Sequence, residues 1–167
     1  MGQMAQFSTV SGITEMGESI DNLVSIYQGQ QMSNSASMIG KQALVNGNWA
    51  QLAGGQLSGT IELPTAANDV RVDIKSETGE VMASLELGAK MAGTQEFTWD
   101  GIKGDGSAAP EANYYLSASA IRDGQSTAPA MQVYGTVQSI QLKGSEVTLN
   151  VSGQGNVSFS NVKRISQ

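Results

Sequence analysis

The densest group of side chains that could do chemistry runs from Asp100 to Ser107, where two carboxylates stand among glycines. A calcium loop of the EF-hand type needs oxygen ligands at its first, third and fifth positions and a glutamate at its twelfth. Counted from Asp100, the third and fifth positions are Ile102 and Gly104, so only Asp100 and Glu111 fit. The spacing favours a polar turn, and the sequence predicts no metal site.

No other set of residues has the spacing of a catalytic site. The chain has no Cys and no His, which excludes thiol nucleophiles, imidazole bases and Cys/His zinc sites. Ser160 and Lys163 match a Ser-x-x-Lys string, but catalytic versions lie on a helix and the pattern here alternates like a strand. None of the 15 Asp and Glu lies in the apolar run that prepares a carboxylate for acid–base work. We predict a protein that is not an enzyme and needs no cofactor.

The charge distribution argues against two classes of partner. The net charge is -6, and the nine Lys and Arg are scattered except for Lys163 and Arg164. A nucleic-acid backbone or an anionic membrane requires a basic stripe, and the sequence has none. No apolar run approaches the roughly 20 residues that span a bilayer. We therefore predict no nucleic-acid partner and no membrane insertion.

The first secondary-structure element that the sequence predicts is a helix. From Val10 to about Met32 the apolar residues follow each other at spacings of three, four, three and four, which predicts one amphipathic helix. An isolated helix of this kind is marginal in water, so its apolar face needs cover. That cover is the chain's own globular part, a second protein, including another copy, or a membrane surface, which is the least favoured because the polar face of the helix is acidic. The candidate contact residues are Ile13, Met16, Ile20, Leu23 and Tyr27.

The middle of the chain predicts an antiparallel β-sandwich. Strand-like alternation recurs over residues 70–75, 81–87, 95–99 and 114–121, separated by turns rich in Gly, Asp and Pro. Phe97 and Trp99 point to the same face of their strand, and Asp100 and Gly101 supply the turn that follows. We interpret these four residues as the motif that anchors the fold of this region.

The remaining segments predict a second, smaller β-domain. Residues 38–45 and the segment around Trp49 read as two short strands, and residues 133–142, 147–151 and 157–162 read as three more. Five strands can close into a small barrel. The expected organisation is therefore a helix and linker in residues 1–35, a barrel in 36–58 plus 131–167, and a sandwich in 59–130 inserted in the barrel. The linker is expected at residues 33–37.

Several strings resemble one family, the bacterial flagellar hook-capping proteins, also called hook assembly scaffolds or basal-body rod modification proteins. The segment Met4–Val10 resembles the end of that family's N-terminal region, and residues 92–101 resemble its inserted domain. Gly135–Val137 with the closing residues 157–165 is similar to its small barrel. The resemblance covers essentially the whole chain.

The resemblance implies a mainly β fold: a Tudor-like barrel interrupted by a fibronectin type III/immunoglobulin-like sandwich and preceded by an amphipathic helix. It implies a structural scaffold that caps the growing flagellar hook, directs the assembly of hook-protein subunits and forms a homo-oligomeric cap. It also implies passage through the flagellar type III export apparatus to the distal tip of the hook, outside the cell. The family's extreme N-terminal segment has no counterpart here, so we expect a fragment of a longer protein.

A different class of function competes with this one. An extracellular β-sandwich that binds carbohydrate or acts as an adhesin would use the loop from Asp100 to Glu111, with Trp49, Trp99 and the tyrosines as a stacking platform. A Trp at strand spacing is more often part of a core. Whether Trp99 is buried therefore discriminates between the two.

Overall fold

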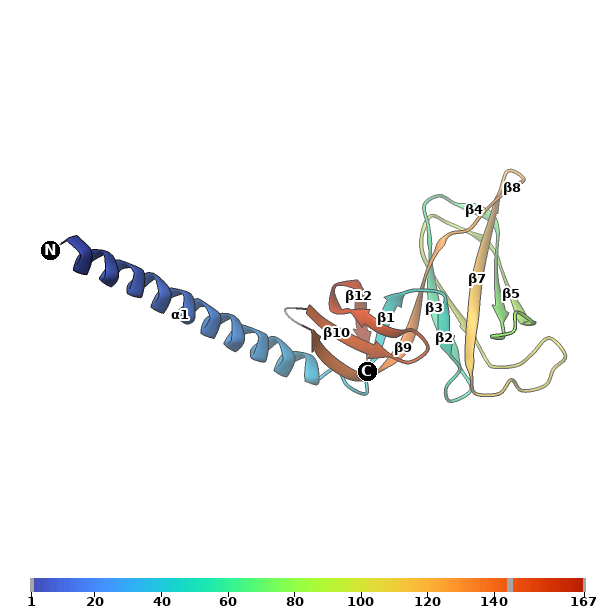
Figure 1. Ribbon diagram of the computed structural model, residues 1–167. Helices are drawn as coiled ribbons and strands as arrows, with labels where there is room; N and C mark the ends of the chain where they lie inside the picture. Colours follow the sequence, from blue (N-terminus) through green and yellow to red (C-terminus); the bar gives the residue numbers. More distant parts are fainter. Residues whose placement is uncertain (1, 144–145, 167) are drawn as a thin grey trace.

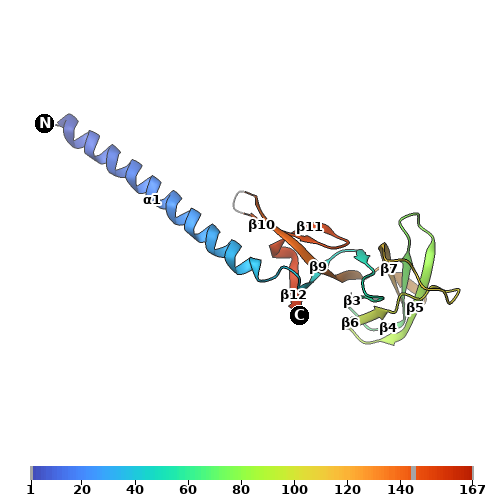
Figure 2. The ribbon, with the colours of Figure 1, turned by 90° about the horizontal axis from the view of Figure 1, so that it is seen from below.

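The computed structural model describes residues 2–143 and 146–166, and for residues 2–11, 31, 34 and 143 it describes the backbone only. One long helix, α1 (Gly2–Ala36), projects from a body made of β-strands. Figure 2, turned by 90°, shows the same projection, so the helix lies against neither part of the body along its length. The predicted mainly β fold with an N-terminal helix is confirmed.

The helix is longer than its sequence pattern predicted. Residues 33–37 were expected to form a linker, but α1 continues to Ala36. Ser and Asn have modest helix propensity, which tertiary contacts override. Ser35 is buried at 5% exposure, and its carbonyl accepts a hydrogen bond from the Met38 amide at 2.9 Å. The last turn is therefore held by the body on which it sits.

The body divides into a small lobe next to the helix and a large lobe beyond it (Figure 1). A single strand, β9, runs through both lobes. The small lobe comprises most of β9 (Ala130–Lys143), with β1 (Gln42–Asn46), β10 (Glu146–Val151), β11 (Gly155–Ser158) and β12 (Val162–Ser166). Residues 132–136 of β9 pair with β1, and residues 137–143 pair with β10.

The small lobe is a strongly curled sheet with the strand order β11-β10-β9-β1-β12. The chain passes from one edge strand, β11, to the other, β12, through only the 3-10 turn Phe159–Asn161. Four strand spacings of about 4.8 Å would separate these edges in a flat sheet by about 19 Å. Three residues of 3-10 helix advance only about 6 Å. The two edges must therefore curl toward each other.

This turn corrects one expectation. Residues 157–162 were predicted to form a single strand, and the structure divides them between β11, the 3-10 turn and the start of β12. The two strands pair with different partners, β11 with β10 and β12 with β1. The alternation of Val157, Phe159 and Val162 was therefore misleading, and Phe159 is 42% exposed.

The large lobe has two layers. The first layer is β3 with β6, and it continues the small-lobe sheet because β3 pairs with the N-terminal half of β9. The second layer is a separate five-stranded sheet of order β2-β7-β4-β5, with β8 paired to β7. The bounds are β2 (Trp49–Gln51), β3 (Leu57–Leu63), β4 (Ala67–Lys75), β5 (Val81–Lys90), β6 (Gly93–Trp99), β7 (Asn113–Arg122) and β8 (Gln125–Thr127).

The strand at Trp49 lies in a different sheet from the one predicted. It was expected beside residues 38–45 in the small lobe, but β2 pairs with β7, Trp49 opposite Tyr115. Three residues carry too little alternation to specify a partner more than 60 residues away in sequence. The strands predicted over residues 70–75, 81–87, 95–99 and 114–121 are confirmed, each slightly extended.

The core of the large lobe is built around the predicted anchor. Phe97 and Trp99 are 3% and 1% exposed. The Trp99 indole N–H donates to the Ile102 carbonyl at 2.8 Å, and its ring meets the edge of Tyr114 with centroids 5.2 Å apart. The Tyr114 hydroxyl donates to the Pro110 carbonyl at 2.7 Å, and burial raises the pKa of this phenol.

Candidate functional site

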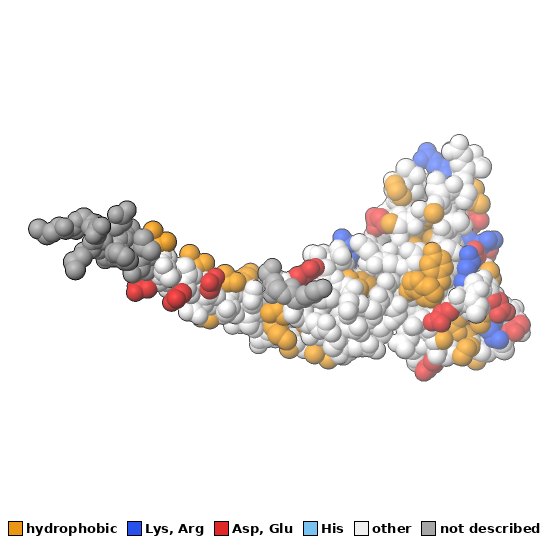
Figure 3. Space-filling model, viewed as in Figure 1, with side chains coloured by type: hydrophobic (Ala, Val, Ile, Leu, Met, Phe, Trp, Pro, Cys, Tyr) orange, Lys and Arg blue, Asp and Glu red, His pale blue; other side chains and the backbone are white. Residues whose placement is uncertain are grey.

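The exposed apolar face of α1 is the first candidate. All five predicted contact residues are more than half exposed: Ile13 62%, Met16 61%, Ile20 54%, Leu23 65% and Tyr27 66%. Val24 and Ile26 flank them and are also exposed. Figure 3 shows apolar side chains along the helix, away from the β body. Packing against the chain's own lobes, one of the covers left open by the sequence, is therefore excluded for these residues.

The charges of the helix lie off this face. Glu15, Glu18 and Asp21 lie on the side of the helical wheel away from the apolar positions, and the chain has no Lys or Arg before Lys41. The hydroxyls of Ser19 and Ser25 donate to the carbonyls four residues earlier, at 2.8 and 2.9 Å, so they are turned onto the helix backbone. The face is thus a broad apolar surface bordered only by acidic and neutral side chains.

The base of the helix is fastened to β9. The amide of Gly40 donates to the Val137 carbonyl at 2.9 Å, and the amide of Val137 donates to the Lys41 carbonyl at 2.9 Å. Gly40 has a φ of 82°, a left-handed conformation that glycine adopts without steric cost. These two bonds fix the direction in which the helix leaves the body.

The acidic loop after Trp99 is a structural turn. Asp100 accepts a hydrogen bond from the Ile102 amide at 3.1 Å, and Gly101, with a φ of 71°, continues the reversal. Asp105 accepts from the amide and hydroxyl of Ser107, which together hold the pKa of this carboxyl below its usual range. Glu111 accepts from the Gly54 amide at 3.1 Å. Asp100 and Asp105 therefore organise their own turns, and Glu111 ties the loop to the turn at Gly54.

The aromatic platform required by a carbohydrate-binding function is not assembled. Trp99 and Tyr114 are buried, which leaves Trp49 and Tyr115 as the partly exposed pair, with ring centroids 5.3 Å apart at 66°. An edge-to-face pair of neighbours on paired strands is ordinary cross-strand packing. The structure thus removes the main support for that alternative.

Two lobes meet at a tight joint, which the sequence analysis missed. The Gln154 side chain, in the turn after β10, donates to the Trp49 carbonyl at 2.7 Å. A Cβ added at Gly153 would lie 2.7 Å from the Gln51 amide nitrogen, so this turn presses directly on β2. Asn48 and Leu116 exchange hydrogen bonds of 2.7 and 2.9 Å. The lobes are fixed to each other by main-chain contacts.

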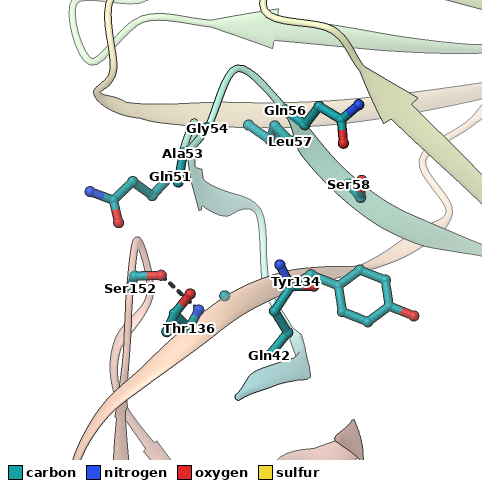
Figure 4. Close-up of a pocket in the computed structure, with 11 residues that line it drawn as sticks. Gln42, Gln51, Ala53, Gly54, Gln56, Leu57, Ser58, Tyr134, Thr136 and Ser152 are labelled. Atoms are coloured by element: carbon teal, nitrogen blue, oxygen red, sulfur yellow. Dashed lines mark hydrogen bonds between the residues drawn. The ribbon is translucent and has the colours of Figure 1, made fainter. Parts of the chain in front are cut away.

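An open polar cleft of about 200 Å³ lies beside this joint, between β3, β9 and the end of β10 (Figure 4). Its lining includes Gln51, Gln56, Ser58, Tyr134 and Ser152. The Ser152 hydroxyl accepts a hydrogen bond from the Thr136 amide at 2.8 Å. A sequence signal existed, because an isolated glycine in a strand, here Gly135, often marks close backbone approach.

The described residues offer neither a membrane-spanning helix nor a metal site. Within residues 2–143 and 146–166 no helix has the length and apolar character needed to cross a bilayer. Among the same described residues no three acidic, Cys or His side chains are grouped so that they could hold a metal ion. The helix face and the cleft thus remain the candidate functional surfaces.

Comparison with known protein sequences gives a consistent result. The FlgD Ig-like domain family matches residues 47–124. The basal-body rod modification protein FlgD of Escherichia coli K12 is 28% identical over 98% of this chain and 74% of its own length. The protein of the same name from Salmonella typhimurium LT2 is 26% identical over the same shares of both chains.

Solved structures show the same relationship. FlgD from P. aeruginosa superposes with a TM-score of 0.72 at 25% identity, over 77% of this chain and 98% of that one. FlgD from Xanthomonas campestris, a structure described as giving insights into the hook capping essential for flagellar assembly, superposes with a TM-score of 0.71 at 26% identity, over 81% and 99%. The domain match, the sequence relatives and the solved structures all point to FlgD, and this chain is thus similar, over 98% of its length in the sequence comparison, to the flagellar proteins of that name.

Proposed function

We propose that this chain is a non-enzymatic scaffold that caps the growing flagellar hook and directs the assembly of hook-protein subunits. The observation that carries this proposal is a rigid FlgD-type β body that presents a long helix with an uncovered apolar face. A scaffold acts through its surfaces and its geometry, and both features suit contact with other protein subunits. On this proposal the protein works at the distal tip of the hook, after export through the flagellar apparatus.

The helix face is the proposed site of cap self-association. Its spacings of three and four residues average 3.5, the period that keeps an apolar seam facing a partner helix in a left-handed coiled coil. The acidic residues Glu15, Glu18 and Asp21 lie off the seam, so copies could pack through it without bringing these charges together. Val24, which adjoins the seam on the helical wheel and is exposed, widens it.

The double variant Ile20→Asp with Leu23→Lys tests this contact. It places two charges in the middle of the seam, where association would have to desolvate them. We expect the oligomers of the unmodified chain to disappear, so that the mass from solution scattering or light scattering falls to that of the monomer. A mass unaffected by the two changes would refute self-association through this face.

A matched control lies on the opposite side of the same helix. Asn22→Lys with Ser25→Asp introduces the same two charges at the same spacing, at positions that are exposed and off the seam. The control should retain the oligomeric mass of the unmodified chain. Loss of oligomers in the control as well would show that added charge, and not its place on the face, causes dissociation.

The hook-capping role itself is tested in cells. The gene that encodes this chain, in its native form, should restore hooks to a hookless strain that lacks its hook-capping protein, as counted by electron microscopy. The seam variant should fail to restore them, while the control variant should succeed. If the protein encoded by the native gene is secreted normally in that strain and no hooks form, the proposed function is wrong.

We further propose that the two lobes act as units corresponding to residues 36–58 plus 131–167 and residues 59–130. Support comes from β1, which pairs with residues 132–136 of β9, and from β10, which pairs with residues 137–143, with β12 and β11 at their outer edges. The strands β2, β4, β5, β7 and β8 form the separate sheet. One short strand, β2, crosses this division because it pairs with β7. The small lobe would then hold the helix, and the large lobe would stand outward to meet arriving subunits.

A further inference from the structure

Strand β6 forms one edge of its layer, because it pairs with β3 and with no other strand of the described chain. Main-chain N–H and C=O groups of successive strand residues point to opposite edges. On β9, the groups of Val137 bond to Gly40 and Lys41, next to β1. By alternation the groups of Val133 also point to β1, so its pair with Gly59 is not hydrogen-bonded and the Gly59 groups point to β6.

This alternation shows which groups of β6 face outward. Phe97 lies opposite Gly59, so these two residues form a hydrogen-bonded pair. The main-chain groups of Thr94, Glu96 and Thr98 therefore point away from β3. Within the described part of the chain these groups have no hydrogen-bond partner, and all three side chains are exposed. The outer edge of β6 is thus an open row of donors and acceptors.

The other sheet edges carry features that hinder the addition of a strand. The strands β2 and β8 have three residues each, and β11 has four. The pairing of β5 with β4 shifts register at three places, and the Met82 carbonyl on β5 accepts from the Gly104 amide at 2.8 Å. The last edge, β12, carries Lys163 and Arg164. Short length, bulges and charges are the usual protection of edges.

Strand β6 has little of this protection. It pairs with β3 over seven residues without a register shift, and it contains no Lys and no Pro. Its single charge is Glu96, whose carboxylate lies 3.7 Å from the Arg164 guanidinium. A long, regular edge of this kind is a template for a further strand.

The interior of the large lobe is incompletely covered beside this edge. The strands β5 and β6 run along the same side of the lobe, because only Met91 and Ala92 connect them and Gly104, shortly after β6, bonds to the start of β5. On β5, Leu85 and Leu87 pack against the core but stay partly exposed. A strand added to β6 would turn every second side chain toward these leucines.

We propose that β6 binds an extended segment of another protein, which adds to its outer edge as an antiparallel strand. The main chain of the segment bonds to the outward groups of Thr94, Glu96 and Thr98. Apolar side chains at alternate positions of the segment cover Leu85 and Leu87. In this mode of recognition the main-chain bonds supply affinity, and the alternate side chains supply specificity.

A second copy of this chain fits the edge less well. In a pair of β6 strands, the side chains of Phe97 and Trp99 would stay in their own core, where they are 3% and 1% exposed, and could not cover Leu85. A pair centred on Glu96 would also place two carboxylates opposite each other, which is destabilising. The occupant is therefore a segment of a different protein, with apolar residues alternating with neutral polar ones.

NMR titration of the ¹⁵N-labelled chain with N-acetyl-Lys-Thr-Val-Thr-Val-Thr-Lys-amide tests this site. We expect saturable shifts of the amide signals of Thr94, Glu96 and Thr98, and at least fivefold slower hydrogen exchange of the Glu96 amide. Before peptide is added, the Glu96 amide should exchange faster than the Phe97 amide, which bonds to β3.

Three results of this titration overturn the proposal. The first is the absence of saturable shifts. The second is exchange at Glu96 that is as slow as at Phe97 in the free chain, because the edge would then be paired already. The third is a set of shifts at Glu96 that follow the concentration of the chain without any peptide, which would assign the edge to a second copy.

Methylated peptides test whether the main chain is recognised. In an antiparallel pair, the Thr residues of the peptide turn their N–H groups toward β6 when the Val residues face Leu85 and Leu87, and the Val N–H groups point away. N-methylation of the central Thr should weaken binding at least tenfold, and N-methylation of the first Val should leave the affinity within twofold. Equal affinity, or equal loss, for both methylated peptides would refute strand addition.

A peptide with Ser in place of both Val residues tests the apolar contact. It should bind at least threefold more weakly than the Val peptide, because Leu85 and Leu87 then stay uncovered. Equal affinity for the two peptides would show that the leucines take no part and that the proposed specificity is wrong.

Two substitutions at Glu96 locate the binding on the protein. Glu96→Pro removes the outward N–H at an edge position, where Pro is tolerated, and should weaken peptide binding at least tenfold. Glu96→Ala removes the same carboxylate but keeps the N–H, and should leave binding unchanged. Equal affinity in both variants would place the peptide elsewhere. The variant Ile20→Asp with Leu23→Lys should bind the peptide like the native chain, so the test is independent of the role proposed for the helix.

Discussion

At the scale of single residues, the sequence predicts most reliably where a large side chain combines with strict alternation. Phe97 and Trp99 were expected in a core because they share a strand face, and both are buried. The turn function of Asp100 was likewise expected from its neighbour Gly101, and its carboxylate caps the Ile102 amide. Local spacing decides such features, because the partners lie within a few residues.

Single residues whose role depends on distant partners could not be predicted in this way. Gln154 and Asn48 look like ordinary turn residues in the sequence, yet each bonds main-chain groups from another part of the chain. The sequence distance from Gln154 to its acceptor Trp49 is 105 residues. No periodicity or local propensity carries information over that distance.

Tyr114 gives a prediction about pH. Its buried phenol has a pKa raised by desolvation, so the folded protein keeps this proton when the unfolded chain, near pKa 10, has lost it. Stability from this group is therefore complete below about pH 10 and is lost as the pH rises through the folded-state pKa.

Urea unfolding at several pH values between about pH 8 and about pH 11 measures this effect. Tyr114→Phe lowers the unfolding free energy at neutral pH, by about 1 kcal/mol, because the Pro110 carbonyl loses its donor. The difference between the native chain and the variant should shrink above about pH 10. Parallel pH profiles for the two proteins would contradict a raised pKa at this site.

At the scale of elements, the sequence predicted the type of nearly every strand and missed some of their ends. The helix ends later than predicted because Ser35 is buried on the body. The last predicted strand is divided in two because its halves belong to opposite edges of a curled sheet. Both errors arise where tertiary contacts override a local pattern. The alternation itself identifies strands but does not specify which strand each will pair with.

One substitution, Gly→Ala, should have opposite effects in two elements. In α1, Gly29 has open space around the site of a new Cβ, so Gly29→Ala should stabilise the helix by about 1 kcal/mol. In β9, a Cβ at Gly135 would lie 2.5 Å from a Val151 methyl and 2.6 Å from the Ser152 carbonyl oxygen. Gly135→Ala should therefore destabilise the small lobe by about 1–3 kcal/mol.

Hydrogen exchange resolved along the chain measures both effects at once. Gly29→Ala should slow exchange of the amides around residue 29 by about fivefold and leave the β body unchanged. Gly135→Ala should speed exchange in β9 and β10 and leave the helix unchanged. If Gly135→Ala is neutral, the close approach between β9 and the end of β10 is not as tight as described.

At the scale of the whole molecule, the residue pattern predicted the number and kind of the β-domains but not how their strands connect. Alternation suggested a small barrel and a sandwich, but the assignment of β2 to the large lobe and the passage of β9 through both became visible only in the fold. Pairing between segments far apart in sequence determines these features.

The joint between the lobes gives a prediction at this scale. Gln154→Ala removes the hydrogen bond to the Trp49 carbonyl and with it about 1 kcal/mol of contact across the joint. Amides of Trp49, Ala50 and Gln51 should then exchange about fivefold faster, because local opening of β2 becomes easier. Gln141→Ala, at an exposed position of β9, is the control and should change nothing there. Unchanged exchange in both variants would show that the joint does not depend on Gln154.

The fastening of α1 to Val137 has a mechanical consequence. At 1.5 Å per residue, the 35 residues of the helix form an arm of about 52 Å. A sideways push at its far end is a torque, and the bonds of Gly40 and Lys41 deliver that torque to the middle of β9. Because β9 continues without interruption into the large lobe, one continuous strand transmits this torque, and no flexible linker is needed to transmit it. A displacement at the helix tip would thus rotate the large lobe together with β9.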